Sequence, residues 1–196
     1  EETTEDMQKM AAMEANTEPY LKTPVWKHAK HRIIWLLVLM ISASITGAII
    51  SKYEAAFAAV PLLVSFIPMI MDTGGNCGSQ SSTLIIRGLA VDELHFADTL
   101  SILWKELRVA LLVGLALAAV ESGVIMIRYN DPALAAVVSL SLMCTVACAK
   151  VTGGLLPIAA KRLGLDPALM AAPLITTVVD TVAMFIYFTI ATMLFH

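Results

Sequence analysis

The sequence predicts an all-α membrane protein with five transmembrane helices in each subunit. Of its 196 residues, 58% are hydrophobic and 15% are charged, whereas soluble domains carry about 25% charged residues. The mean hydropathy is +0.79, and five apolar stretches are each long enough to cross a bilayer. The formal net charge of −3 argues against a cationic nucleic-acid-binding surface, so we expect no nucleic-acid partner.

A membrane span needs about 20 apolar residues to cross a hydrocarbon core of roughly 30 Å. The five predicted spans cover residues 33–50, 57–86, 107–127, 132–156 and 168–195. Residues 88–104 are predicted to form a surface helix. Its polar side chains favour a solvated segment over a metal site, and they are Asp92, Glu93, His95 and Asp98.

The distribution of Lys and Arg predicts the orientation, because cytoplasmic loops carry an excess of both residues. A cytoplasmic N-terminus and an external C-terminus place ten of them inside and two outside. The inner set is Lys9, Lys22, Lys27, Lys30, Arg32, Arg87, Lys105, Arg108, Lys161 and Arg162, and the outer set is Lys52 and Arg128. We therefore expect a multi-pass protein of the cell (inner) membrane.

The chain divides into a polar lead-in, residues 1–24, and a five-helix transmembrane domain, residues 25–196. Six acidic residues lie in the first eighteen positions, and apolar residues at helical spacing favour a short amphipathic cytoplasmic helix followed by a hinge. A solvated linker and a helix docked under the membrane domain are both open alternatives.

Ionisable residues inside spans cost at least about 2.5–3.5 kcal/mol each at the helix centre, so each requires a reason. Four are expected: Asp72, Glu121, Lys150 and Asp180. Glu121 lies near an outer helix end, and the aliphatic stem of Lys150 is expected to carry its ammonium group to the inner interface. Asp180 falls near mid-membrane among apolar neighbours, which makes it the strongest candidate for function.

Oxygen-bearing groups accompany Asp180 along its helix. Thr176 and Thr177 precede it by four and three residues, and Pro173 lacks a backbone donor, which is expected to free a carbonyl near Leu169. Carboxylate, hydroxyl and carbonyl oxygens suit a hard divalent cation or its water shell. The alternative is a protonated carboxyl group that is hydrogen-bonded within the helix bundle.

The second predicted span carries a polar stripe, because Asp72, Asn76 and Gln80 recur every four residues. Gly74, Gly75 and Gly78 either open this helix or let another backbone approach closely. Together the two features favour a permeation path. Asp72-Thr73-Gly74 also spells the aspartic-protease tripeptide, but its surroundings fit neither the soluble nor the intramembrane proteases, so we expect a protein that is not an enzyme.

Two long segments resemble one known family. PMIMDTGGNCGSQSSTLIIRGLA and LGLDPALMAAPLITTVVDTVAMFIYF, with the lead-in TEDM and PYLKTPVW, are similar to the membrane domain of the MgtE family of magnesium channels. The likeness covers essentially the whole chain. The family normally carries an N-terminal domain and a CBS pair before the lead-in helix, and neither is in this sequence, so closure at high internal Mg²⁺ is expected to be weaker.

The resemblance implies a homodimer whose pore lies on the two-fold axis, lined by the second and fifth helices of both subunits. Asp180 would recognise hydrated Mg²⁺ through its waters, with a backbone carbonyl at Thr176 and the side chain of Asn76 nearby. Glu5 and Asp6 would lie on a plug-like helix and bind regulatory Mg²⁺.

Two choices stay open from the sequence. Mn²⁺, Co²⁺ and Ca²⁺ are alternatives to Mg²⁺, since oxygen ligands suit several divalent cations. A carrier coupled to Na⁺ or H⁺ is the alternative to a channel, and a membrane-embedded scaffold is the alternative outside transport.

Overall fold

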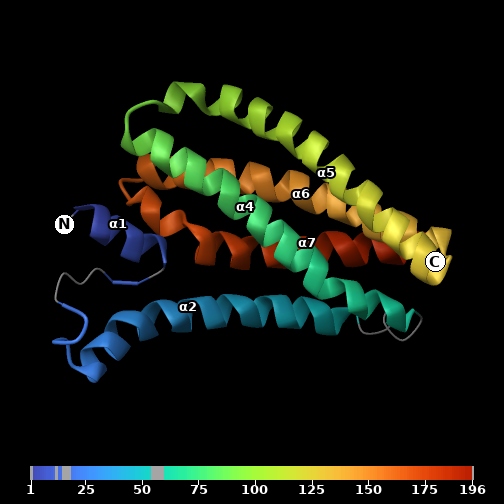
Figure 1. Ribbon diagram of the computed structural model, residues 1–196, viewed down its shortest axis with the longest axis horizontal. Helices are drawn as coiled ribbons and strands as arrows, with labels where there is room; N and C mark the ends of the chain where they lie inside the picture. Colours follow the sequence, from blue (N-terminus) through green and yellow to red (C-terminus); the bar gives the residue numbers. More distant parts are fainter. Residues whose placement is uncertain (1, 12, 15–18, 54–59, 196) are drawn as a thin grey trace.

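The computed structural model describes residues 2–11, 13–14, 19–53 and 60–195, and its regular structure in these residues is entirely helical (Figure 1). The all-α prediction is confirmed. The longer helices are α1 (Glu2–Met10), α2 (Val25–Lys52), α4 (Ile67–Ala90), α5 (Thr99–Tyr129), α6 (Pro132–Arg162) and α7 (Ala172–Phe195), and the short 3₁₀ helices are η1 (Pro61–Phe66), η2 (Phe96–Asp98) and η3 (Pro167–Met170).

Four helices in the described part of the chain are long and apolar enough to cross a membrane: α2, α5 together with η2, α6 and α7. These correspond to the first, third, fourth and fifth predicted spans. The remaining predicted span corresponds to α4, whose 24 residues would extend about 36 Å at 1.5 Å per residue. Its glycines and polar side chains lower its hydropathy, although it is long enough to span.

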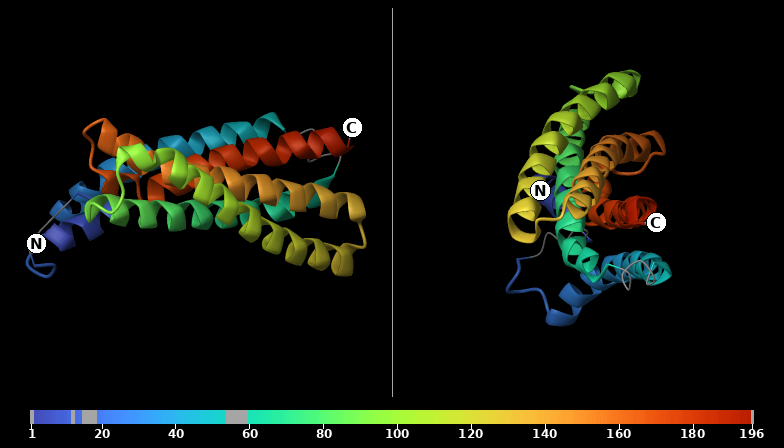
Figure 2. Two further views of the ribbon diagram at one scale, coloured as in Figure 1. Left: turned by 90° about the horizontal axis from the view of Figure 1, so that it is seen from above. Right: turned by 90° about the vertical axis from the view of Figure 1, so that its right-hand side faces the viewer.

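The five long helices run roughly along one direction, and α1 lies at one end of the bundle (Figures 1 and 2). α4 packs against both α6 and α7, and α5 packs along α6. α2 packs against α7 on the other side. α4 and α7 are therefore neighbours across most of the bundle.

Apolar side chains fill two main regions between these helices. At the end where α7 terminates, Tyr187, Phe188 and Ile70 are fully buried, and the Tyr187 hydroxyl donates a 2.8 Å hydrogen bond to the Leu63 carbonyl. Further along, Val146, Ile175 and Val179 form a second cluster with neighbouring residues. These clusters fix α7 against α4 and α6.

Glycines on α4 and α6 permit close backbone approach. A Cβ atom on Gly75 would lie 2.9 Å from Cγ2 of Thr176, and one on Gly78 would lie 2.7 Å from Cγ2 of Ile175. A Cβ atom on Gly153 would collide with the Gly78 carbonyl oxygen. α4 stays continuous through its glycines, so close approach rather than helix opening is their role in this structure.

The predicted surface helix over residues 88–104 is wrong. α4 continues to Ala90, residues 91–95 form a turn and loop, and α5 begins at Thr99 after η2. The His95 backbone N–H donates to Oδ2 of Asp98 at 2.9 Å, which caps the start of η2 and ends the loop. The Asp98 side chain thus serves as a cap in this segment.

Candidate ion-binding site

The polar stripe of α4 faces away from the bundle core. Asp72, Asn76 and Gln80 are exposed in the single chain, and the Asn76 Nδ2 group donates to Oδ2 of Asp72 at 3.1 Å. A hollow of about 670 Å³ runs along the stripe and is lined by Asn76, Ser79, Gln80, Thr83 and Leu84. The chain therefore presents an open groove along the part of the stripe that contains Asn76 and Gln80, and Asp72 lies beyond its lining.

Asp180 lies half-buried on α7, and α7 packs against α4, the helix that carries Asp72. None of the ion pairs formed by described residues involves Asp180. Asp72 and Asp180 are thus two carboxyl groups on neighbouring helices, and the ion pairs of the described residues give neither of them a basic partner. Two like charges in a low-dielectric setting require compensation, either by a cation or by a proton on one of the carboxyl groups.

Two threonine hydroxyls near Asp180 bond within their own helix. Thr176 and Thr177 both donate to the Pro173 carbonyl, at 3.0 and 2.8 Å. Pro173 is the second residue of α7, so it starts the helix instead of interrupting it, and its missing donor falls among the N–H groups that lack helical partners anyway. The hydroxyl oxygens keep lone pairs for water or an ion.

Lys150 does not extend to the membrane interface as the sequence suggested. Its residue is 4% exposed, and Nζ donates to the Ser81 hydroxyl at 3.4 Å. Ser81 in turn donates to Oε2 of Glu106 at 2.6 Å. Sequence reasoning missed Glu106 because the third span was predicted to begin at residue 107, whereas α5 begins at Thr99 and carries this carboxylate inside the bundle.

The short helix α1 docks on the bundle at η3. Nζ of Lys9 donates to Oδ2 of Asp166 at 2.8 Å, while Oδ1 of Asp166 accepts the Ala168 N–H at 2.9 Å and caps η3. Burial raises the pKa of Asp166, but the hydrogen bonds from Lys9 and Ala168 and the charge of Lys9 outweigh it and leave the pKa below its usual value. In this structure α1 therefore contacts the η3 end of the bundle, and its cytoplasmic placement stays a prediction.

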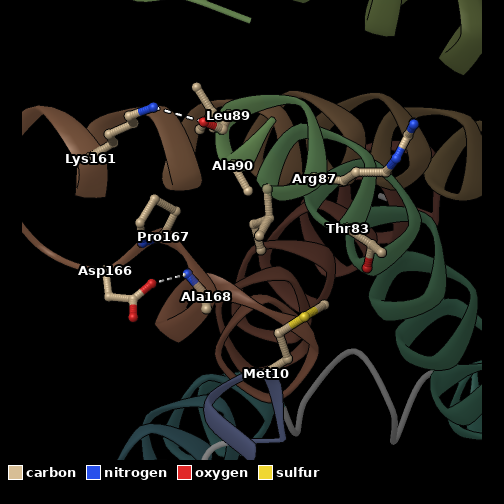
Figure 3. A pocket seen from close by; sticks show the side chains of 10 residues that line it. Met10, Thr83, Arg87, Leu89, Ala90, Lys161, Asp166, Pro167 and Ala168 are labelled. Carbon is tan, nitrogen blue, oxygen red and sulfur yellow. Dashed lines mark hydrogen bonds between the residues drawn. The ribbon is translucent and has the colours of Figure 1, made fainter. Parts of the chain in front are cut away.

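A cavity of about 370 Å³ lies where α1 meets the ends of α4 and α6 (Figure 3). Met10 closes it from the α1 side, and Ile86, Leu89 and Pro167 contribute apolar surface. Glu5 is partly buried on α1, while the side chain of Asp6 lies outside the described residues. A regulatory ion at these two acids thus stays a prediction.

The titratable side chains of the described residues do not gather into a ready-made metal centre. No group of three or more His, Cys, Asp or Glu residues in that part of the chain is placed to hold a metal ion. Cys77, Cys144 and Cys148 are all free thiols. The candidate site in one chain is therefore a pair of carboxylates with an amide beside an open groove.

Comparison with known families assigns the chain as a whole. The family model described as MgtE, divalent cation transporter, matches residues 67–190, which run from the start of α4 into α7. The chain belongs to the MgtE family. The matched residues include Asp72, Asp180 and the helices that carry them. Membership of a transporter family and the presence of several helices that are long and apolar enough to cross a bilayer together identify a multi-pass membrane protein.

Individual relatives of this MgtE-family chain extend the match to the lead-in segment. The chain is 36% identical over 195 residues to the magnesium transporter MgtE of Thermus thermophilus, a match that covers 98% of this chain and 43% of that protein. It is 33% identical to the magnesium transporter MgtE of Bacillus subtilis, covering 100% of this chain and 43% of the relative. The chain thus spans less than half the length of the curated relatives that it matches.

Proposed function

We propose that this chain forms the ion-conducting part of a Mg²⁺ channel in the cell membrane, with Asp180 recognising the hydrated ion. The observation that carries the proposal is the packing of α7, which carries Asp180, against α4, whose exposed stripe of Asp72, Asn76 and Gln80 follows a groove left open in the single chain. Membership of a divalent cation transporter family supports it. The relatives' names supply the choice of Mg²⁺.

The sparse ligand set suits a hydrated Mg²⁺ ion. Mg²⁺ is small, prefers octahedral oxygen coordination and dehydrates reluctantly, so it usually keeps several waters in protein sites. Two carboxylates and the Asn76 amide can bind those waters without replacing them, and the Thr176 backbone carbonyl is a further acceptor in the proposed site. Contact through water holds the ion weakly, which conduction requires.

The open groove favours assembly into a homodimer. A stripe of amide, hydroxyl and carboxyl groups facing lipid would leave polar atoms without partners in hydrocarbon. A second subunit related by a two-fold axis would place its own groove opposite and double the number of carboxylates around the path. In the proposed dimer α4 and α7 of both subunits line the pore, and α2 and α5 face the bilayer.

The proposed orientation has the N-terminus in the cytoplasm and the C-terminus outside. It rests on the excess of Lys and Arg at the helix ends near α1. Mg²⁺ would then enter the cell from the α7 C-terminal side, and α1 would lie at the inner mouth, where Glu5 and Asp6 bind regulatory Mg²⁺. Mn²⁺, Co²⁺ and Ca²⁺ are the other ions to compare in the flux test below.

The test is Mg²⁺ flux into proteoliposomes that contain a fluorescent Mg²⁺ indicator. Wild-type flux should persist without a Na⁺ or H⁺ gradient and should be lost in Asp180→Asn. Glu121→Gln is the matched control, because Glu121 is also half-buried in a long helix, α5, but is not part of the site. Flux that requires a Na⁺ or H⁺ gradient would establish a coupled carrier, and unchanged flux in Asp180→Asn would remove Asp180 from the path.

A further inference from the structure

A buried chain of three polar groups joins α4, α5 and α6 behind the proposed pore face. Glu106 on α5 is 9% exposed, Ser81 on α4 is 1% exposed and Lys150 on α6 is 4% exposed. The Ser81 hydroxyl donates to Oε2 of Glu106 at 2.6 Å and accepts from Nζ of Lys150 at 3.4 Å. The proposed conduction mechanism does not use any of these groups directly.

The hydroxyl is the link between the two charged residues. The ion pairs formed by described residues do not include one between Glu106 and Lys150. An ammonium group can only donate and a carboxylate can only accept, so a hydroxyl between them satisfies both. Ser81 Oγ also lies 3.3 Å from the Cys77 carbonyl, but the shorter contact takes its single proton to Glu106. Removing Ser81 would leave two buried charges without this connection, which is costly in a low-dielectric interior.

Helix geometry places Ser81 opposite the pore stripe. Ser81 follows Asp72 by nine residues, and at about 100° per residue this separation is about two and a half turns. At the same angle per residue, Asn76 and Gln80 lie within about 90° of Asp72 around the helix axis. Ser81 therefore faces α5 and α6 whenever the stripe faces the groove, and a rotation of α4 about its axis would break the hydrogen bonds to Glu106 and Lys150.

The same surroundings leave little room for an alternative arrangement. A Cβ atom on Gly153 would lie 3.1 Å from Cβ of Ser81, and one on Gly154 would lie 3.6 Å from Cγ of Glu106. Small residues on α6 thus bring α4 and α5 close enough for the chain to form. The geometry of this region is specific to one rotation of α4.

We propose that Glu106, Ser81 and Lys150 are positioning residues that lock the rotation of α4, and so aim Asp72, Asn76 and Gln80 at the ion path. This inference rests on the proposed conduction through the groove. These three residues affect the ion path by fixing the rotation of α4, and they do not contact the ion themselves. Their loss changes how well the stripe binds the hydrated ion, in addition to any change in folding.

The test compares Ser81→Ala with a matched control, Ser139→Ala. Ser139 on α6 also links two helices, because its hydroxyl donates to the Ala118 carbonyl of α5 at 3.1 Å, and this hydrogen bond does not involve α4. Two quantities are measured in folded, monodisperse protein: the half-saturating Mg²⁺ concentration for flux, and the thiol reactivity of Gln80→Cys in a background with Cys77, Cys144 and Cys148 replaced by Ala.

Ser81→Ala should raise the half-saturating Mg²⁺ concentration by about tenfold, the order of effect of one lost charge-assisted hydrogen bond, and should lower the reactivity of Gln80→Cys. Ser139→Ala should change neither. Glu106→Gln combined with Lys150→Met removes both buried charges together, so it should fold even if Ser81→Ala does not, and it should shift both quantities in the same direction.

Unchanged half-saturation and thiol reactivity in the folded variants would overturn the positioning role and leave the chain as a stabilising contact. The thiol measurement needs no transport, so it separates the two proposals. If wild-type protein shows no Mg²⁺ flux, the proposed function fails, while a changed reactivity of Gln80→Cys would still support rotation control of α4.

Discussion

The contact between Gly153 on α6 and Gly78 on α4 gives the sharpest test of how the helices pack. A Cβ atom on Gly153 would collide with the Gly78 carbonyl oxygen and lie 3.1 Å from Cβ of Ser81. Both obstacles belong to rigid parts of α4, so Gly153→Ala must push the two helices apart. That separation would also loosen the apolar cluster around Val146 and Ile175.

The expected magnitude comes from two opposing effects. Overpacking a well-filled interior costs about 1–3 kcal/mol, and the collision with backbone places this site at the upper end. Alanine in place of glycine in a helix gains about 0.8–1 kcal/mol. The net loss in the free energy of unfolding is then about 2 kcal/mol, which corresponds to a fall in melting temperature of about 4–8 °C for a chain of this size.

The assay is thermal unfolding in detergent of purified Gly153→Ala and of a matched control, Gly123→Ala. Gly123 lies in the helix α5, and a Cβ atom there meets nothing within 4 Å, so the control should be as stable as wild type or slightly more stable. A melting temperature of Gly153→Ala equal to or above that of the wild type would refute the close packing of α4 on α6.

Three further predictions concern individual hydrogen bonds. Tyr187→Phe leaves the buried Leu63 carbonyl without its 2.8 Å hydrogen bond and should cost about 1–3 kcal/mol in thermal unfolding; no change would mean that water replaces the hydroxyl. Thr46→Val removes the 2.8 Å contact to the Thr181 hydroxyl that links α2 to α7, and should cost about 0.6 kcal/mol, seen as faster hydrogen exchange in α2 but not in α5. The lowered pKa of Asp166 means that its carboxylate is ionised at pH 7 and that the contact with Lys9 contributes fully above the ordinary value of about 3.9. The protection of the α1 amides from hydrogen exchange, corrected for the intrinsic effect of pH on exchange, should fall as the pH drops below that range, whereas in Asp166→Asn it should be low at every pH.

The sequence predicted the helical class and most span positions because apolar periodicity and length carry that information locally. Four predicted spans correspond to apolar helices in the structure. Their bounds differ because charged residues such as Lys161 and Lys105 continue helices beyond the apolar stretch. Helix ends depend on caps and on tertiary contacts, as the His95–Asp98 cap shows, and hydropathy does not report these.

The polar stripe of α4 was visible in the sequence because its spacing repeats at the helical period. The buried chain through Ser81 was not, since its members come from three helices and only their packing brings them together. Lys150 looked like an interfacial lysine for the same reason, because the serine that accepts its hydrogen bond lies 69 positions earlier in the chain. Contacts of this kind, between residues far apart in the sequence, can be identified only from the tertiary structure.

The measurement that tests the central claim most directly is Mg²⁺ protection of a thiol in the groove, with Asp180 intact and with Asp180→Asn. Gln80→Cys and Val179→Cys are made in the background without native cysteines, and modification by a charged methanethiosulfonate is followed with and without Mg²⁺. Val179 is 3% exposed, so its cysteine should stay unreactive. Gln80 is exposed and lines the groove, so its cysteine should react, Mg²⁺ should slow that reaction, and Asp180→Asn should abolish the slowing; a rate that Mg²⁺ leaves unchanged with Asp180 intact, or slows equally in Asp180→Asn, would contradict recognition of the ion by Asp180.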